Sequence, residues 1–171
     1  MKTNCRSLAL LAMVALLATP LYAQDDGIGL EKGSVAPGAV VETLEGKPVD
    51  LAQYVGKKPV LMEFWATWCE NCHALEPTMK AMHTKYGKDV QFVGVAVSIR
   101  QSPERIKAYV AKHALPWVQV FDRKGNASGA YDAPATSYVV VIDGAGKVVY
   151  TGLGGKQDLE SAIRKALGRR S

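Results

Sequence analysis

A buried strand that leads directly into a close pair of cysteines is the feature that most constrains the fold of this chain. Residues 59–66 (PVLMEFWA) form a mostly apolar run of strand length, and Cys69 and Cys72 follow almost at once. A continuous apolar strand is typical of a sheet that is covered on both faces. Beyond the cysteines, apolar side chains recur at helical spacing up to Gly87. These side chains are Leu75, Met79, Met82 and Tyr86. The segment therefore predicts a central strand followed by a helix that begins at Cys69, with both methionines in the core.

The remaining apolar and turn patterns predict an α/β domain. We expect a β-hairpin before the central strand, a second buried strand after the first helix, and then a helix opened by Ser102-Pro103-Glu104. A short strand, a second hairpin and a terminal helix complete the order. The expected ranges are 40–43 with 49–51, 90–97, 103–113, 116–121, 137–143 with 147–151, and 156–167. A βαβ unit followed by a ββα unit predicts a mixed central sheet with helices on both faces.

The N-terminus has the layout of a secretory signal peptide. Lys2 and Arg6 form a short positive head, residues 8–17 are apolar, and a cleavage point follows at Ala23. An uncleaved membrane anchor is the alternative, but the apolar stretch is shorter than the roughly 20 residues that span a bilayer. We therefore expect removal of residues 1–23, a periplasmic or otherwise exported location, and no stable membrane insertion of the mature chain.

The charge distribution argues against a nucleic-acid-binding protein, and the cysteine content points to a chemical role for one cysteine pair. Loss of the leader lowers the formal net charge from +5 by two, and the remaining basic residues are scattered without interleaved aromatics, which argues against nucleic acid as a partner. Residues 24–38 are polar and aperiodic, so we expect a flexible lead-in to one domain over residues 39–168. In the mature chain only Cys69 and Cys72 remain, and the loop between them is too short to restrict the unfolded chain much. The pair is therefore expected to perform chemistry.

The expected position of the cysteines gives each sulfur a separate role. The unpaired N–H groups and the dipole of a helix start should lower the pKa of Cys69 and favour its thiolate. Cys72, one turn further on and expected to be less exposed, is placed to resolve a mixed disulfide. Glu70 between them is an anionic neighbour that should offset part of the helix effect. A less stabilised thiolate makes the couple less oxidising, which favours a reductant.

Residues 59–77 closely resemble the active-site strand and first helix of the thioredoxin superfamily. The matching residues are Phe64, Trp65, Ala66, Trp68, Cys69, Cys72 and Pro77. The leader, the WATWC segment, the extra N-terminal hairpin and the insertion before a late proline are similar to the exported reductases of the TlpA and ResA type. This looser resemblance covers about residues 35–168. It implies a thioredoxin fold, thiol–disulfide oxidoreductase activity through a redox-active disulfide, and no cofactor or metal.

The resemblance also implies roles for residues outside the cysteine pair. Glu63 stands where the family places a buried acid that takes the proton of the resolving thiol, and burial would raise its pKa. The alternative is an acid on a partly exposed edge strand. Pro134 resembles the family's cis-proline, which faces the disulfide and, with Ala133, presents backbone to the substrate. Asp143 lies nine residues after Pro134, about three more than the family pattern, so an ordinary trans turn proline is the alternative. Trp68 resembles a platform beside the thiolate, with a plain core aromatic as the alternative.

The implied partners are exported proteins that carry thiols or disulfides, and a membrane electron donor. Apocytochrome thiols, a copper-site protein and misoxidised proteins in general are all compatible clients.

Three other chemistries use similar residues. Cys69-x-x-Cys72-His73 is also the pattern of c-type haem attachment, although such domains are largely helical and this motif ends a β-rich run. A copper module would use both cysteines with His83 or His113, although both histidines also suit structural positions on helices. A peroxiredoxin would need Thr or Ser three residues before the reactive cysteine, where this chain has Ala66.

Overall fold

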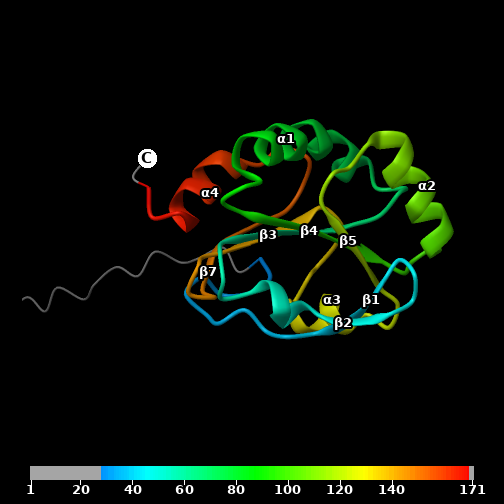
Figure 1. Cartoon of the computed structure of the whole chain (residues 1–171), viewed down its shortest axis with the longest axis horizontal. Coiled ribbons are helices and arrows are strands. Elements are labelled where there is room, and N and C mark those ends of the chain that lie inside the picture. The colour runs from blue at the N-terminus through cyan, green and yellow to red at the C-terminus, as the bar shows by residue number, and fades with distance from the viewer. Residues whose placement is uncertain (1–27, 170–171) are drawn as a thin grey trace, which may run out of the picture.

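Within residues 28–169, which the computed structural model describes, seven strands form one mixed sheet with helices on both faces (Figure 1). The strand order is β2-β1-β5-β4-β3-β6-β7, in which β3, β4 and β5 are parallel and the other pairs antiparallel. The strands are β1 Val40–Thr43, β2 Pro48–Asp50, β3 Val60–Trp65, β4 Gln91–Val97, β5 Val118–Asp122, β6 Tyr138–Ile142 and β7 Val148–Gly152. The helices are α1 Glu70–Tyr86, α2 Pro103–His113, α3 Asn126–Ala130 and α4 Leu159–Ala166, with a 3₁₀ turn, η1, at Leu51–Tyr54.

Each face of the sheet has its own buried cluster. Figure 1 shows α1, α2 and α4 on one face and α3 on the opposite face, near β1 and β2. Met79 and Met82 of α1 are buried in the first cluster, as the sequence predicts. Tyr131 and Tyr138 are fully buried in the second. The predicted mixed sheet with two helical layers is thus confirmed.

Strand β3 occupies the middle of the sheet between β4 and β6, and all six of its residues are buried. Successive side chains of a strand point to opposite faces. Leu61 and Trp65 belong to the cluster under α1, whereas Met62 and Phe64 belong to the other cluster. Glu63 therefore faces the layer of α1. This alternation brings a carboxylate to the side of the sheet on which α1 carries the cysteines.

The predicted element order is confirmed, with two additions and one shortened helix. The 3₁₀ turn and α3 were not expected from the sequence. Helix α2 begins as predicted, because the Ser102 side chain accepts a hydrogen bond from the Arg105 N–H and Pro103 takes the first position. Helix α4 begins at Leu159 and not at residue 156, because Asp158 is its N-cap and Gln157 bonds to a different segment.

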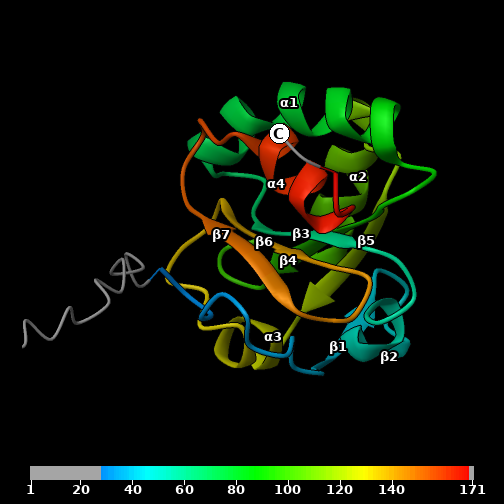
Figure 2. The same ribbon diagram turned by 90° about the vertical axis from the view of Figure 1, so that its left-hand side faces the viewer.

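Residues 28–38 differ from the flexible lead-in that the sequence predicts. Val35 forms an antiparallel bridge with Lys147, and the Gly33 N–H donates to the Val148 carbonyl at 2.7 Å. Figure 2 shows this segment running from the side of β7 past α3 towards β1. The segment satisfies backbone groups on the outer edge of the sheet, an interaction that its polar composition does not reveal. The predicted signal peptide and residues 24–27 lie outside the described residues.

Among residues 28–169, no helix has the length and apolar character needed to cross a membrane.

Candidate active site

The two cysteines lie at the N-terminus of α1 and form a disulfide. Cys69 is the N-cap residue, Cys72 lies in the first turn, and their Cα atoms are 5.2 Å apart. The Cys72 N–H donates to the Cys69 sulfur at 3.1 Å. The expected helix start at Cys69 is thus confirmed, with its sulfur beside the free N–H groups that stabilise an anion. Cys69 is 4% exposed and Cys72 5%, so the disulfide form does not show the expected lower exposure of Cys72.

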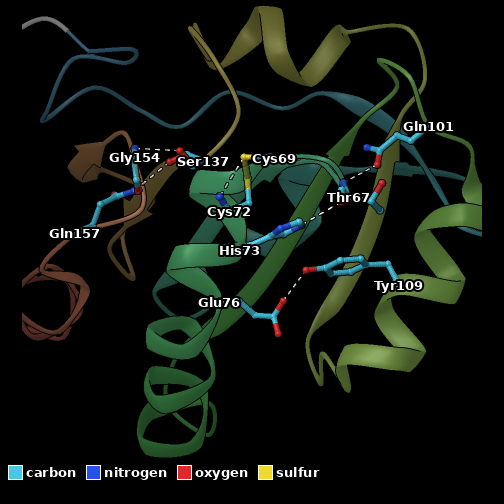
Figure 3. Close-up of a disulfide and its surroundings, with 10 residues drawn as sticks. All are labelled: Thr67, Cys69, Cys72, His73, Glu76, Gln101, Tyr109, Ser137, Gly154 and Gln157. Carbon is cyan, nitrogen blue, oxygen red and sulfur yellow. Dashed lines mark hydrogen bonds between the residues drawn. A yellow bond between two sulfur atoms is a disulfide. The ribbon is translucent and has the colours of Figure 1, made fainter.

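Trp68 forms part of the surface beside the disulfide, and so it is not a plain core aromatic. Trp68 is 38% exposed, and its Nε1–H donates to the carbonyl of Ile99 at 2.7 Å. A second contact joins the same two segments, since the Thr67 N–H donates to Oε1 of Gln101 at 2.9 Å (Figure 3). These bonds fasten the loop after β4 to the turn that carries Cys69. Trp68 and the exposed Ile99 side chain therefore form a fixed apolar rim.

Pro134 does not have the cis geometry that the resemblance implies. Every peptide bond of residues 28–169 is trans, and Pro134 is exposed. Pro134 and Ala133 instead line a pocket of about 210 Å³ together with Phe64 and Ile99. The long spacing from Pro134 to Asp143 had pointed to the alternative of a trans turn proline, and the structure supports that alternative.

Ser137 is the residue of this segment that Figure 3 draws among the surroundings of the disulfide, and it is not among the site residues that the sequence predicts. It is fully buried with φ 67°, a left-handed conformation that is uncommon for a serine. Its N–H donates to the Phe64 carbonyl at 2.8 Å, which joins it to the end of β3. Its Oγ accepts from the Gly154 N–H at 3.0 Å, and its carbonyl accepts from Nε2 of Gln157 at 3.0 Å. The three extra residues between Pro134 and Asp143 are the sequence signal that could have pointed to Ser137, which stands six residues before Asp143.

Glu63 is buried behind the cysteines, as the sequence predicts. It is 6% exposed on a central strand, which excludes the edge-facing alternative. Its Oε1 has no hydrogen-bond partner in the described part of the chain. Burial, and to a lesser extent the negative charge of Glu76, raises the pKa of Glu63 to about 8. Glu63 and Cys72 line the same small cavity, so a proton leaving Cys72 has a carboxylate nearby.

A second carboxylate, Glu76, lines that cavity and was not recognised from the sequence. Glu76 lies one turn beyond Cys72 on α1 and accepts a hydrogen bond from the Tyr109 hydroxyl of α2 at 2.8 Å (Figure 3). His113 and Lys80 also contact it. The helical spacing of four from Cys72 to Glu76 could have indicated a shared face, but the partners on α2 depend on tertiary packing.

The histidines of the haem and copper alternatives have other partners. His83 packs edge-on against the Phe92 ring at 5.2 Å between centroids. Nδ1 of His113 lies 3.0 Å from Oε2 of Glu76. Nε2 of His73 lies 3.1 Å from the Thr67 carbonyl. Residues 28–169 contain no cluster of three or more His, Cys, Asp or Glu side chains that could hold a metal ion.

The comparisons with known proteins agree with this geometry. The Redoxin family model matches residues 31–167. The thiol-disulfide oxidoreductase ResA of Geobacillus thermodenitrificans is 30% identical over 162 residues, which cover 92% of each chain. The thioredoxin-like protein YneN of Bacillus subtilis is 29% identical over 80% of this chain and 81% of its own.

Two solved structures share the fold over most of the chain. A Chlorobium tepidum protein, assigned as the thiol:disulfide interchange protein DsbE, has a TM-score of 0.71 and 30% identity, covering 81% of this chain and 99% of that one. The thioredoxin domain of a Bacteroides vulgatus thiol-disulfide oxidoreductase has a TM-score of 0.68 and 26% identity, covering 80% and 97%. With a Cys-x-x-Cys pair at the start of α1, the chain belongs to the Redoxin family, in which it is a TlpA/ResA-like thiol–disulfide oxidoreductase of the thioredoxin superfamily.

Proposed function

We propose that this oxidoreductase works outside the cytoplasm, in the periplasm of its cell, and reduces disulfide bonds in exported client proteins. The observation that carries the proposal is the position of Cys69 at the N-terminus of α1, with Glu63 buried on the side of Cys72. The signal-peptide pattern of residues 1–23 supports export. A membrane electron donor would return the disulfide to the dithiol.

The reaction uses two exchange steps. The Cys69 thiolate attacks one sulfur of the client disulfide, forms a mixed disulfide, and releases the other client sulfur as a thiolate. Glu63 in its ionised form then takes the proton of Cys72. The Cys72 thiolate attacks the Cys69 sulfur, which forms the internal disulfide and releases the second client thiolate. Two electrons have then passed to the client, and the donor must supply two for the next cycle.

The charges around the dithiol support the direction of electron flow. Glu70 is exposed beside Cys69, and the ionised Glu76 lines the cavity at Cys72. Negative charge nearby disfavours a thiolate. A less stabilised thiolate makes the dithiol a better reductant, because the reduced form gains less from ionisation.

The surface next to the disulfide supports a polypeptide client. Trp68 and Ile99 are exposed, at 38% and 61%, and Leu153 is 40% exposed in the loop that holds Ser137. An apolar rim around a buried disulfide can bind an extended segment that carries a cysteine. Apocytochrome thiols, a copper-site protein and misoxidised exported proteins are the client classes that we propose.

Cysteine variants test the assigned roles. A Cys72→Ser variant should accumulate mixed disulfides with exported proteins, because the resolving thiol is missing. A Cys69→Ser variant, the matched control, should trap none and should lose all exchange with a protein disulfide such as insulin. Trapped species are counted on non-reducing gels with and without a reductant. Failure of Cys72→Ser to trap any protein would contradict the roles given to the two sulfurs.

The midpoint potential tests the direction. Thiol labelling of residues 24–171 across a redox buffer series should give a value near or below about −230 mV, the range of reducing thioredoxin-like proteins. A value near about −120 mV would make the protein an oxidant and overturn the proposed direction.

A further inference from the structure

The contact between α1 and α2 contains a carboxylate that is held from both helices. The two oxygens of Glu76 accept from the Tyr109 hydroxyl at 2.8 Å, from Nδ1 of His113 at 3.0 Å and from Nζ of Lys80 at 2.8 Å. The Tyr109 and His113 rings are stacked with centroids 3.8 Å apart, which fixes both donors. Such a set of donors holds the Glu76 carboxylate in one position.

This carboxylate lies at the cavity of the dithiol. Glu76, Glu63 and Cys72 line one small cavity of about 10 Å³, the lower limit for a single water molecule. Its other walls come from Trp65, Tyr109, Leu115 and Trp117. Figure 3 shows Glu76 below Cys72 along α1, with its carboxylate turned to Tyr109. Largely apolar walls screen charge weakly, so the charge of Glu76 acts strongly on the two groups beside it.

The two carboxylates differ in the partners that stabilise an anion. Partial burial raises the pKa of Glu76, but the hydrogen bonds from Lys80, Tyr109 and His113 together outweigh it, and the net shift is downward. Glu63 has an oxygen without a hydrogen-bond partner among residues 28–169, and its pKa is raised. At neutral pH the negative charge therefore lies on Glu76, and Glu63 keeps its proton.

We propose that Glu76 is a positioning residue whose fixed negative charge adds to burial in keeping a proton on the Glu63–Cys72 pair, and so raises the pH at which Cys72 resolves a mixed disulfide. The inference rests on the proposed exchange cycle, because resolution requires that this pair first lose one proton. The charged and titratable groups that face Glu76 are Lys80 of α1, Tyr109 and His113 of α2, and Glu63 of β3.

A two-phase reaction separates attack from resolution. Reduced protein is mixed with excess dithionitrobenzoate; the Cys69 thiolate releases one thionitrobenzoate, and the Cys72 thiolate then displaces the second from Cys69. The rate of the second release is followed between about pH 5 and pH 9. In wild type we expect this rate to rise with a midpoint near the pKa of Glu63, about 8. In Glu76→Gln we expect the midpoint about one unit lower and the release about tenfold faster near pH 6.

Two further variants make the result specific. Glu160→Gln is the matched control, because Glu160 accepts hydrogen bonds from the Tyr86 hydroxyl and from Lys85 but does not line the cavity. It should keep the wild-type profile. Glu76→Asp keeps the charge and should return the midpoint most of the way to wild type.

The other outcomes overturn the inference in distinguishable ways. An unchanged midpoint in Glu76→Gln would make Glu76 a structural residue. A slower second release at every pH would make it a carrier of the proton and not a fixed charge. Absence of a second release in the wild type would instead contradict the proposed exchange cycle itself.

Discussion

At the scale of single residues, burial places the Glu63 carboxyl group near Cys72 but makes ionisation of that group unfavourable in the folded protein. A carboxylate is ordinarily stabilised by water or by hydrogen-bond donors. Glu63 is only 6% exposed, and Gly94, its partner in the β3–β4 pair, has no side chain that could carry a positive charge. The folded protein therefore favours the protonated form. That preference suits a group that must receive a proton from Cys72, and it makes folding stability depend on pH.

The sign of this dependence follows from proton binding. The ordinary glutamate pKa is 4.5 and that of Glu63 is about 8, so between these values the folded state holds a proton that the unfolded chain has released. The free energy of unfolding should therefore fall as pH rises through this window, by on the order of 3–5 kcal/mol. In Glu63→Gln this fall should disappear, because the amide does not titrate. Urea unfolding of the oxidised protein at about pH 5 and pH 9 measures the difference.

The control for this prediction is Glu160→Gln, at an exposed glutamate that is ionised throughout the window. It should retain the wild-type pH slope. The slope and not the absolute stability is compared, since a buried amide at position 63 has its own desolvation cost. An equal slope in wild type and Glu63→Gln would show that Glu63 is ionised in the folded protein at neutral pH.

At the scale of elements, the segment between α3 and β6 is the part of the site that depends on tertiary contacts. Ser137 is held by β3 through Phe64 and by the loop before α4 through Gly154 and Gln157. The Gln157 side chain is thus one of three contacts that hold Ser137. Its amide also donates to the Gly154 carbonyl at 2.8 Å and accepts from the Tyr150 hydroxyl.

We expect Gln157→Ala to weaken client binding more than the chemistry of the sulfurs. Loss of the bond to Ser137 should loosen the segment 133–137 and lower kcat/KM for insulin reduction about fivefold, as a loss of about 1 kcal/mol implies. The reaction with dithionitrobenzoate should change less than about twofold. Gln91→Ala is the control, because the Gln91 amide bonds to the adjacent Phe92 carbonyl, and Gln91 pairs with Val60 at the end of β3 that is remote from the cysteines. Equal losses with both substrates would show that Gln157 acts on the cysteines themselves.

The same elements show what the sequence could predict. The apolar run of β3, the helical spacing of α1 and the cap of α2 are local patterns, and each gave the correct element. Helix α3 spans five residues, and its first N–H groups bond to the Asp122 carboxylate at the end of β5. Such a short helix has too little periodicity to be recognised. Cys69, Cys72 and Glu63 came from one continuous segment, whereas Ser137 and Glu76 take their roles from contacts with distant residues.

At the scale of the whole molecule, residues 28–38 connect the edge of the sheet at β7 to the buried rings of Phe64, Tyr131 and Tyr138. The Leu30 N–H donates to the Tyr138 hydroxyl at 3.1 Å, and the Tyr131 hydroxyl donates to the Pro37 carbonyl at 2.9 Å. Both rings pack on Phe64, at 5.7 and 5.5 Å between centroids. Phe64 is also the residue whose carbonyl holds Ser137. Residues 28–38 are thus linked through one buried layer to the strand ends at the disulfide.

Removal of this segment should therefore affect both stability and the site. A chain of residues 39–171 lacks the bonds to Tyr131 and Tyr138 and those along β7, so its free energy of unfolding should be lower than that of residues 24–171 by on the order of 3 kcal/mol. Amide hydrogen exchange should rise at residues 137–139, because the start of β6 loses its contacts with residues 28–38. A Val35→Ser variant is the control, because Val35 is 64% exposed and its backbone bridge to Lys147 remains in the variant. If the truncated chain were as stable as the longer one, with unchanged exchange at residues 137–139, the segment would only lie on the surface, and the link from the sheet edge to the disulfide would be absent.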